Sequence, residues 1–249
     1  MKLRLLTLAC LCAALTPAAL ADDFGMGLEL NAEKSLTKQW DIEAGGELRT
    51  QNTLSDIERW SIGLGTAYRL LKTKQWQMKA DLGYQLMARR ILAENTKKYH
   101  YPAYWSPRHR AYASLSAGWK VSKRLELSLR ERYQFTRRQT CNLERFYISD
   151  PTHRADDKVK DAESESLLRS RLQLKVNTRK KCPWTPYLSV EWLNDLSDAF
   201  SLDQTRYIVG TDYKLNKHNS LGVSYRYKDK SNSEEAKGHL LTISYSYDF

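Results

Sequence analysis

The chain lacks any long apolar run beyond Leu20. Its 249 residues are 28% charged, and no later stretch is apolar over the length that a membrane-spanning helix requires. A helical membrane protein is therefore excluded. Common enzyme signatures are missing too, because none of the five histidines lies in a Gly-x-Ser-x-Gly or His-Glu-x-x-His setting. We assign no catalytic, metal-binding or cofactor-binding residues and expect a protein that is not an enzyme.

The N-terminus has the features of an export signal. Two bases precede an apolar stretch over residues 5–15, and the small-x-small sequence Ala19-Leu20-Ala21 follows. This pattern predicts a signal peptide over residues 1–21, cleaved before Asp22. Residues 22–249 then form a single domain. Cleavage removes two bases, so the net charge falls from +11 for the whole chain to +9 for this domain. A basic surplus suits nucleic-acid binding, but an exported chain seldom meets nucleic acid. We expect the basic residues instead to contact anionic lipopolysaccharide or to line a basic lumen.

The exported part alternates apolar and polar residues with a period of two, which is typical of strands with two different faces. In the final segment, Leu241, Ile243, Tyr245, Tyr247 and Phe249 share the apolar face. The ending with Tyr245, Tyr247 and Phe249 resembles the signal by which the barrel-assembly machinery recognises and inserts outer-membrane barrels. The alternating segments cover 23–34, 39–50, 57–71, 76–88, 108–120, 124–136, 166–177, 184–193, 205–215, 220–230 and 239–249.

A membrane barrel and a soluble β-sandwich both have strands of alternating apolar and polar residues. The lengths of the connections between strands must therefore distinguish them. Short connections, such as 35–38 and 72–75, take turns with long ones, such as 89–107 and 137–165. Outer-membrane barrels combine short periplasmic turns with longer extracellular loops. Tryptophans lie beside the short connections, as an interfacial aromatic belt requires; they are Trp40, Trp76, Trp119 and Trp184. We predict an all-β protein, a monomeric transmembrane antiparallel β-barrel of about 10–12 strands in the bacterial outer membrane, in contact with its lipid.

Two features do not fit a regular barrel. Bacterial single-chain barrels have even strand numbers, and segment 23–34 would run parallel to the last segment. We expect residues 39–249 to form the barrel with ten strands, with 23–34 as an extra element; the alternative is a further strand in a long connection. Glu131 also falls in the apolar row beside Leu129. Because a carboxylate is costly at mid-depth in the membrane, we expect a β-bulge to turn it inward.

The exported chain keeps two cysteines, Cys141 and Cys182. An oxidising compartment favours their pairing, but the predicted strand order places a whole strand between them. Because a disulfide needs Cα atoms within about 7 Å, we predict two free thiols.

The polar face of the segments carries more bases than acids. The candidate lumen charge network is Arg59, Arg69, Arg130, Arg132, Arg169, Arg171, Arg206, Glu126, Glu191 and Asp212. Further charges on this face are Arg49, Lys79, Arg110, Lys175, Arg226, Asp41, Glu43, Glu47 and Asp81. In a narrow barrel these side chains would interlock as a salt-bridged plug. We expect this closed lumen, with a structural or interaction-based role; the alternative is a narrow channel for small anionic solutes.

A lipid hydrolase at the barrel rim is a third hypothesis, which needs a serine beside a histidine. The residues near long connections that would have to pair through space are His100, His109, His153 and His239 with Ser106, Ser164 or Ser244. Loop 97–107 mixes bases with aromatics, which suits stacking on sugars, contact with lipid phosphates or folding over the barrel mouth. Loop 137–165 has no calcium-loop pattern, so we expect it to be solvated; among many bases it carries the carboxylates Asp150, Asp156, Asp157, Asp161, Glu163 and Glu165.

Several segments together resemble one family. They are Arg124–Thr136, Leu168–Leu174, Pro186–Glu191 and Arg206–Asn216. The family is an uncharacterised group of outer-membrane barrels known only as a domain of unknown function, DUF2490. The resemblance would cover essentially the whole exported chain. It implies architecture and location, and it supplies no activity or catalytic residues.

Overall fold

A computed structural model describes residues 24–51, 54–150, 152–178, 182–230 and 238–249. Within these ranges no helix is both long and apolar enough to cross a membrane. The fold is all-β. Its strands are β1 (Phe24–Ser35), β2 (Trp40–Gln51), β3 (Asp56–Lys72), β4 (Trp76–Ile91), β5 (Glu94–Asn95), β6 (Tyr99–Tyr101), β7 (Tyr104–Lys120), β8 (Leu125–Arg138), β9 (Cys141–Tyr147), β10 (Arg154–Lys160), β11 (Glu163–Val176), β12 (Trp184–Asp195), β13 (Ser201–Lys214), β14 (Asn219–Lys230) and β15 (Gly238–Asp248).

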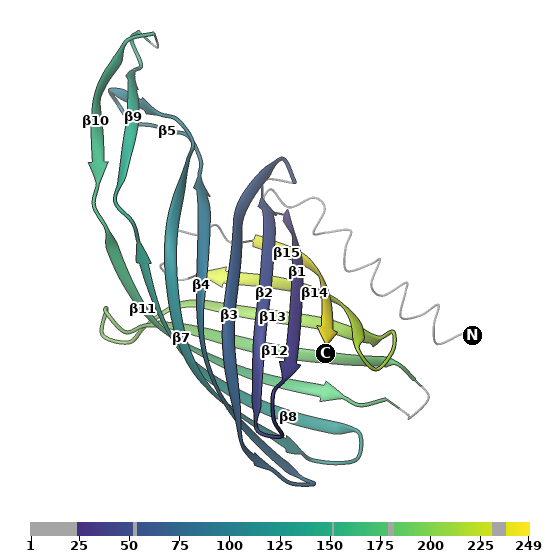
Figure 1. The fold of residues 1–249 in the computed structure, drawn as a ribbon. Coiled ribbons are helices and arrows are strands. Elements are labelled where there is room, and N and C mark those ends of the chain that lie inside the picture. The colour runs from purple at the N-terminus through teal and green to yellow at the C-terminus, as the bar shows by residue number, and fades with distance from the viewer. Residues whose placement is uncertain (1–23, 52–53, 151, 179–181, 231–237) are drawn as a thin grey trace.

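Eleven strands close into a barrel in the order β1-β15-β14-β13-β12-β11-β8-β7-β4-β3-β2 (Figure 1). Strands that follow one another around the wall are antiparallel everywhere except at the closure. We call the end that carries the short connections 36–39, 73–75, 121–124 and 215–218 the turn end, and the opposite end the loop end. All eleven segments that alternate in the sequence are strands of this barrel.

The expectation of ten strands with residues 23–34 outside the barrel is wrong. β1 pairs antiparallel with β2 and parallel with β15, in a register that runs from Phe24 opposite His239 to Glu33 opposite Asp248. An odd number of up-and-down strands forces one parallel pair, because the first and last strands then run in the same direction. This pairing satisfies the backbone groups that β2 and β15 would otherwise expose to hydrocarbon, where unsatisfied groups are costly.

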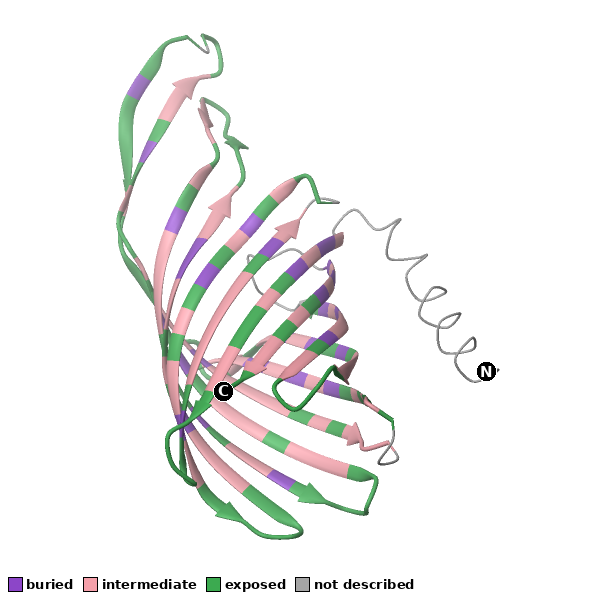
Figure 2. Cartoon of the chain, turned by 45° about the vertical axis from the view of Figure 1, so that its right-hand side comes forward, coloured by how far each residue is buried: buried purple, intermediate pink, exposed green. Residues whose placement is uncertain are grey.

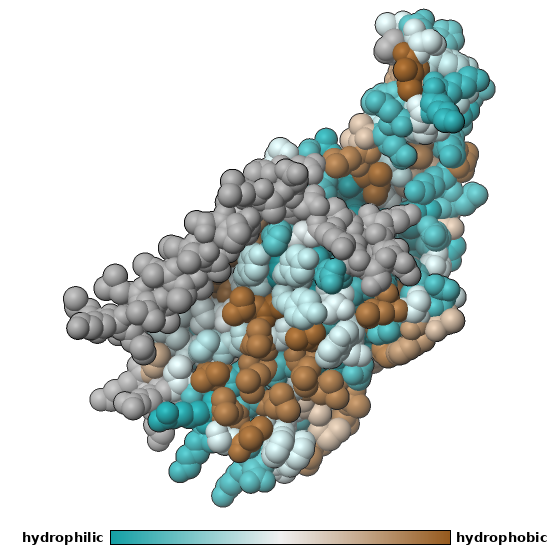
Figure 3. Space-filling model, turned by 180° about the vertical axis from the view of Figure 1, so that it is seen from behind, coloured by the Kyte–Doolittle hydropathy of each residue, from teal (hydrophilic) through white to brown (hydrophobic). Residues whose placement is uncertain are grey.

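The barrel is apolar outside and charged inside, the reverse of a soluble protein. Leu30 and Leu64 are 62% and 66% exposed on the outer surface, whereas Glu191 is 0% exposed. Exposed positions recur along the strands between less accessible ones (Figure 2). On the face seen in Figure 3, apolar side chains gather over the barrel wall, and hydrophilic ones lie toward its ends. A lipid environment accounts for this pattern, because hydrocarbon then covers the apolar face.

Aromatic side chains form contacting pairs around the turn end. The ring centroids of Trp40 and Tyr68 are 4.8 Å apart, those of Trp76 and Trp119 5.5 Å, and those of Trp184 and Tyr213 4.6 Å. Each tryptophan is exposed on the outer face. Indole and phenol rings favour the boundary between hydrocarbon and headgroups, so these pairs mark one membrane interface.

A second sheet, with the order β10-β9-β6-β5, projects beyond the loop end (Figure 1). We call it the arm. Its two hairpins, from chain segments expected to be loops, are joined through Tyr99 opposite Tyr147. The two rings are 5.3 Å apart, and the guanidinium carbon of Arg145 lies 4.3 Å from the centre of the Tyr99 ring. The aromatic and basic residues noted in the sequence therefore pack on one another within the arm.

The β-bulge expected at Glu131 is absent from the described strands, so that expectation is wrong. β8 pairs with both neighbours without a shift in register, and Glu131 lies opposite Leu115 on β7 and Ser170 on β11. The carboxylate therefore stays on the outer face. The Ser170 hydroxyl donates a hydrogen bond of 2.6 Å to it, which offsets part of the cost of placing a polar group there.

Cys141 lies in the arm and Cys182 just before β12 at the turn end, and no disulfide joins them. The signal peptide predicted over residues 1–21 lies outside the described residues.

Candidate functional site

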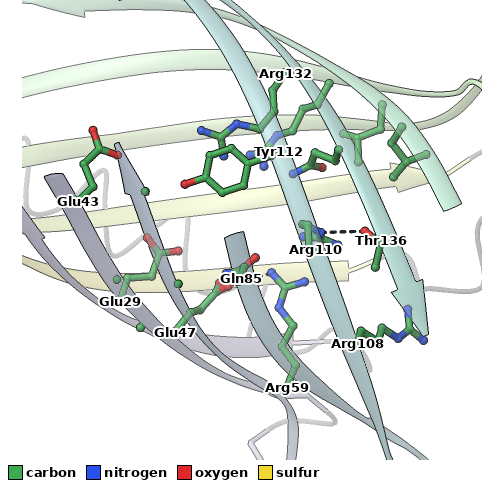
Figure 4. A pocket seen from close by; sticks show the side chains of 18 of the residues that line it. Glu29, Glu43, Glu47, Arg59, Gln85, Arg108, Arg110, Tyr112, Arg132 and Thr136 are labelled. Atoms are coloured by element: carbon green, nitrogen blue, oxygen red, sulfur yellow. Dashed lines mark hydrogen bonds and ion pairs between the residues drawn. The ribbon is translucent and has the colours of Figure 1, made fainter. Parts of the chain in front are cut away.

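The barrel encloses a cavity of 910 Å³ that is lined mainly by charged side chains (Figure 4). Its lining includes twelve arginines: Arg49, Arg59, Arg89, Arg108, Arg110, Arg130, Arg132, Arg138, Arg169, Arg171, Arg206 and Arg226. Nine carboxylates also line it: Glu29, Glu33, Glu43, Glu47, Glu163, Glu165, Asp195, Asp203 and Asp248. Arginines are therefore in excess around the free volume.

The two signs of charge are partly segregated, although Arg49 also lies on β2 and Glu163 and Glu165 lie on β11. β1 and β2 supply Glu29, Glu33, Glu43 and Glu47, whereas β7, β8 and β11 supply seven of the arginines. Figure 4 shows Glu29, Glu43 and Glu47 across the cavity from the β7 and β8 side chains. Because lumen-facing residues recur at every second position, a repeated Arg-x-Arg on one strand gives a basic row.

On the basic wall, arginines lie directly opposite one another in neighbouring strands. Arg169 on β11 pairs with Arg132 on β8, and Arg171 pairs with Arg130. Like charges placed opposite each other in a sheet are destabilising. A nearby carboxylate is therefore needed to hold this wall together.

Glu191 on β12 is that carboxylate, and it is fully buried. The Nη2 atom of Arg169 lies 2.6 and 2.7 Å from its two oxygens, and Nε of Arg171 lies 2.9 Å from Oε1. Arg130 and Arg206 approach it to 3.8 Å. One carboxylate thus contacts four guanidiniums from three other strands.

The acidic wall is more evenly paired. Arg49 and Arg59 both bind Glu47, Arg59 at 3.0 Å. Arg69 binds the buried Asp41 at 2.7 Å near the turn end. Lys79 in turn contacts Glu43 and Asp81. These ion pairs crosslink β2, β3 and β4 on the inside of the barrel.

Tyr112 projects from β7 across the lumen face of β4 (Figure 4). A Cβ atom at Gly83 would lie 2.2 Å from Cζ of Tyr112, so only glycine leaves room for the ring. The guanidinium carbon of Arg132 lies 4.2 Å from the centre of this ring, in cation–π geometry. The ring therefore supports Arg132 from one side.

The structure places the predicted network residues in two groups. Arg130, Arg169, Arg171, Arg206 and Glu191 converge in one cluster. The others lie apart from it: Arg59 with Glu47, Arg69 with Asp41, Arg132 over Tyr112, Glu126 with Gln77 at the turn end, and Asp212 beside Gly222. Sequence reasoning missed Tyr112, although a tyrosine in an otherwise polar row was a usable signal. Arg108, Arg138 and Glu29 were missed as well.

In two of the histidine–serine combinations of the hydrolase hypothesis, the residues share a strand but lie on opposite faces. Ser106 and His109 lie on opposite faces of β7, and His239 and Ser244 on opposite faces of β15, because each pair is an odd number of residues apart. His100 instead contacts Asn95 in the arm. Within the described ranges, no group of three or more histidine, cysteine or acidic residues is arranged to hold a metal ion.

The fold is that of bacterial outer-membrane barrels. The chain superposes on the "Translocator domain of autotransporter NalP from Neisseria meningitidis" with a TM-score of 0.52 and 13% identity, covering 79% of this chain and 70% of that one. A NanC porin gives 0.49 with 16% identity, over 90% of this chain and 96% of that one. The Pseudomonas putida toluene transporter TodX gives 0.45 with 12% identity, over 86% and 72%.

Comparison with curated proteins gives no match. A family model matches residues 24–238, which is nearly the whole of the described barrel. The chain therefore belongs to the family described as "Protein of unknown function (DUF2490)".

Proposed function

We propose that the barrel admits small anionic solutes into its lumen and conducts them across the outer membrane. The observation that carries this proposal is the excess of arginine around a free cavity: twelve arginines against nine carboxylates around 910 Å³. Guanidinium groups bind carboxylates and phosphates through paired hydrogen bonds, and a row of them favours the entry of anions.

The extent of the cavity supports passage rather than a closed pocket at one end. Its lining includes Arg138 and Glu163 at the loop end of β8 and β11. It also includes Glu33 and Asp248 at the turn end of β1 and β15. Free volume therefore lies against wall residues from both halves of the barrel.

The second candidate function is a closed structural barrel, which we expected from the sequence. The ion pairs of Arg59 with Glu47, Arg69 with Asp41 and Arg169 with Glu191 favour it, because they crosslink the wall from inside. These pairs lie against the wall, and the cavity remains beside them. The two functions predict different electrical behaviour.

Planar bilayer recording under a KCl gradient tests the proposal. We expect single-channel steps and a reversal potential of the sign that chloride selectivity gives. Arg132→Gln should reduce this selectivity, because it removes a lumen charge. Arg154→Gln is the matched control, since it removes the same charge from the exposed arm and should leave selectivity unchanged. A folded barrel without steps would establish the closed structural function instead.

We further propose that residues 1–21 direct export and that Tyr245, Tyr247 and Phe249 are read by the assembly machinery. In support, Tyr245 near the end of β15 and Phe249 just after it are exposed, and the Phe249 backbone N–H donates to the Glu33 carbonyl at 2.9 Å. The arm, with its bases and tyrosines, is the surface we propose for lipopolysaccharide. Outer-membrane fractionation with heat-modifiable gel migration tests this location, and recovery as a soluble periplasmic species would contradict it.

A further inference from the structure

A row of exposed aromatic side chains crosses the outer wall toward the loop end. Tyr84 on β4 and Phe135 on β8 both lie opposite Ala111 on β7, and they are 50% and 37% exposed. His109 lies next to Ala111 on the same face of β7, ten residues from Trp119 at the turn end. Ten residues at about 3.3 Å each, tilted by about 40°, span about 25 Å, the height of the apolar band of a membrane barrel. His109 therefore lies at the second membrane interface.

The outer positions beyond this aromatic row are basic. Arg137 on β8 is exposed and lies directly opposite His109 on β7. Arg90 on β4 lies opposite Trp105 on β7, four residues further from the turn end than His109. Within the described part of the chain, neither guanidinium makes a hydrogen bond or an ion pair. Among the described outer positions of β4, β7 and β8 beyond the row, none is acidic. Two bases therefore lie at headgroup level beside aromatic rings.

His109 holds the hydroxyl group of Tyr84 next to these bases. Its Nδ1 atom is hydrogen-bonded to the Tyr84 hydroxyl, and its Nε2 atom lies 2.5 Å from the amide nitrogen of Gln139. Because that amide donates to Nε2, the ring proton lies on Nδ1 and is donated to the Tyr84 oxygen. The Tyr84 O–H can then donate to a further acceptor.

Arg137 and Tyr84 lie close enough to contact one ligand. Neighbouring strands are about 4.8 Å apart, so β4 and β8 are about 10 Å apart across β7. Both long side chains start on the outer face, on either side of His109. A ligand placed over His109 would receive a charged donor from β8 and a hydroxyl donor from β4.

We infer that Arg137, Tyr84 and Arg90 bind a phosphate of lipid A, the part of lipopolysaccharide that carries phosphates and acyl chains. The guanidinium fork matches phosphate oxygens. Short turns of outer-membrane barrels are periplasmic, so the loop end reaches the outer leaflet, where the anionic lipid is lipopolysaccharide. The aromatic row beside the bases would contact the acyl chains, which a free phosphate lacks. The ligand is therefore a lipid.

The inference rests on the proposed outer-membrane location and on neither conduction nor the arm. The arm projects beyond the loop end (Figure 1), so its proposed contact is with the sugars of lipopolysaccharide. The wall site would instead contact lipid A at the membrane surface. Lipid A without sugar chains therefore probes the wall site alone.

Native mass spectrometry of the refolded barrel in a non-ionic detergent tests the site, with bisphosphorylated lipid A as the probe. We expect lipid A to bind, and lipid A without its phosphates to bind at least tenfold more weakly. Arg137→Gln should weaken binding about tenfold, the loss of one charged hydrogen bond. Tyr84→Phe keeps the ring and should weaken binding about fivefold. It also keeps the test valid if Arg137→Gln fails to fold.

Two arginine variants serve as matched controls. Arg124→Gln removes the same charge from an exposed position just before β8 at the turn end. Arg154→Gln removes it from the arm. Both should bind lipid A as the unmodified barrel does. Loss of binding in Arg154→Gln but not in Arg137→Gln would place the phosphate at the arm and overturn the wall site.

Three other results would overturn the site. They are equal binding of lipid A without phosphates, unchanged binding in both folded site variants, and displacement of lipid A by an equal concentration of inorganic phosphate. Failure of the site differs from failure of the location. A barrel that fractionates with the outer membrane but does not bind lipid A keeps the location and rejects the site, whereas a soluble periplasmic barrel rejects both.

Discussion

Replacing Glu191 by glutamine tests what holds the arginine wall together. Glu191 is fully buried and receives Arg169 at 2.6 and 2.7 Å and Arg171 at 2.9 Å. Glutamine keeps the size and one acceptor but removes the charge that balances four guanidiniums. Removing one partner of a buried ion pair costs about 3–5 kcal/mol. Because the cluster borders a cavity that water can enter, we expect the lower value, about 3 kcal/mol.

Urea unfolding of the barrel in lipid vesicles, followed by tryptophan fluorescence, measures this loss. We expect the free energy of unfolding of Glu191→Gln to fall with an unchanged denaturant slope. Arg169→Gln should also destabilise the barrel. The double variant should lose less than the sum of the two single losses, by about 2 kcal/mol, because the residues are in contact.

Glu126→Gln is the control, because Glu126 bonds Gln77 in an exposed position at the turn end. Its effect should stay below about 1 kcal/mol. The reasoning is refuted if Glu191→Gln costs no more than this control, or if its effect adds fully to that of Arg169→Gln.

Three further predictions concern the wall, the lipid face and assembly. Gly83→Ala should cost about 1–3 kcal/mol in the same unfolding assay, because the new Cβ would overlap Tyr112; adding Tyr112→Ala should remove that clash, and a persistent extra loss would argue against it. Glu131→Leu should raise the free energy of unfolding by about 1 kcal/mol, since it takes a carboxylate off the lipid face; a large decrease would mean that its bond with Ser170 outweighs the cost of exposing the charge to lipid. Phe249→Ala should lower the heat-modifiable fraction in outer membranes, and normal assembly would contradict a role in the insertion signal.

The strands of the barrel wall follow from the sequence because their cause is local. Alternation at every second residue fixes which side chains face lipid, whatever strand lies alongside. The end of β1 was predicted at residue 34 and lies at Ser35, and β12 begins at Trp184 as expected. Larger errors occur at the loop end, where strands extend further than the alternation does. β7 begins at Tyr104 rather than residue 108, because β4 continues to pair with it up to Ile91 opposite Tyr104.

The arm was missed for a related reason. β6 and β9 are short, and their pairing joins Tyr99 to Tyr147 across a long stretch of chain. No local pattern in either segment indicates a partner so far away. Only the tertiary structure decides this contact.

For the site, the sequence determined that arginines and carboxylates share the inner face, because they occupy alternate positions along the strands, opposite to the apolar residues. It could not determine that Glu191 meets arginines from β8, β11 and β13, since that depends on the order of strands around the wall. The closure of the barrel between β1 and β15 likewise depends on the tertiary structure. The direction of β1 follows from counting strands, but its pairing with β15 depends on how tightly the sheet curls. Side-chain alternation is a property of one strand, whereas neighbours and curvature are properties of the whole sheet.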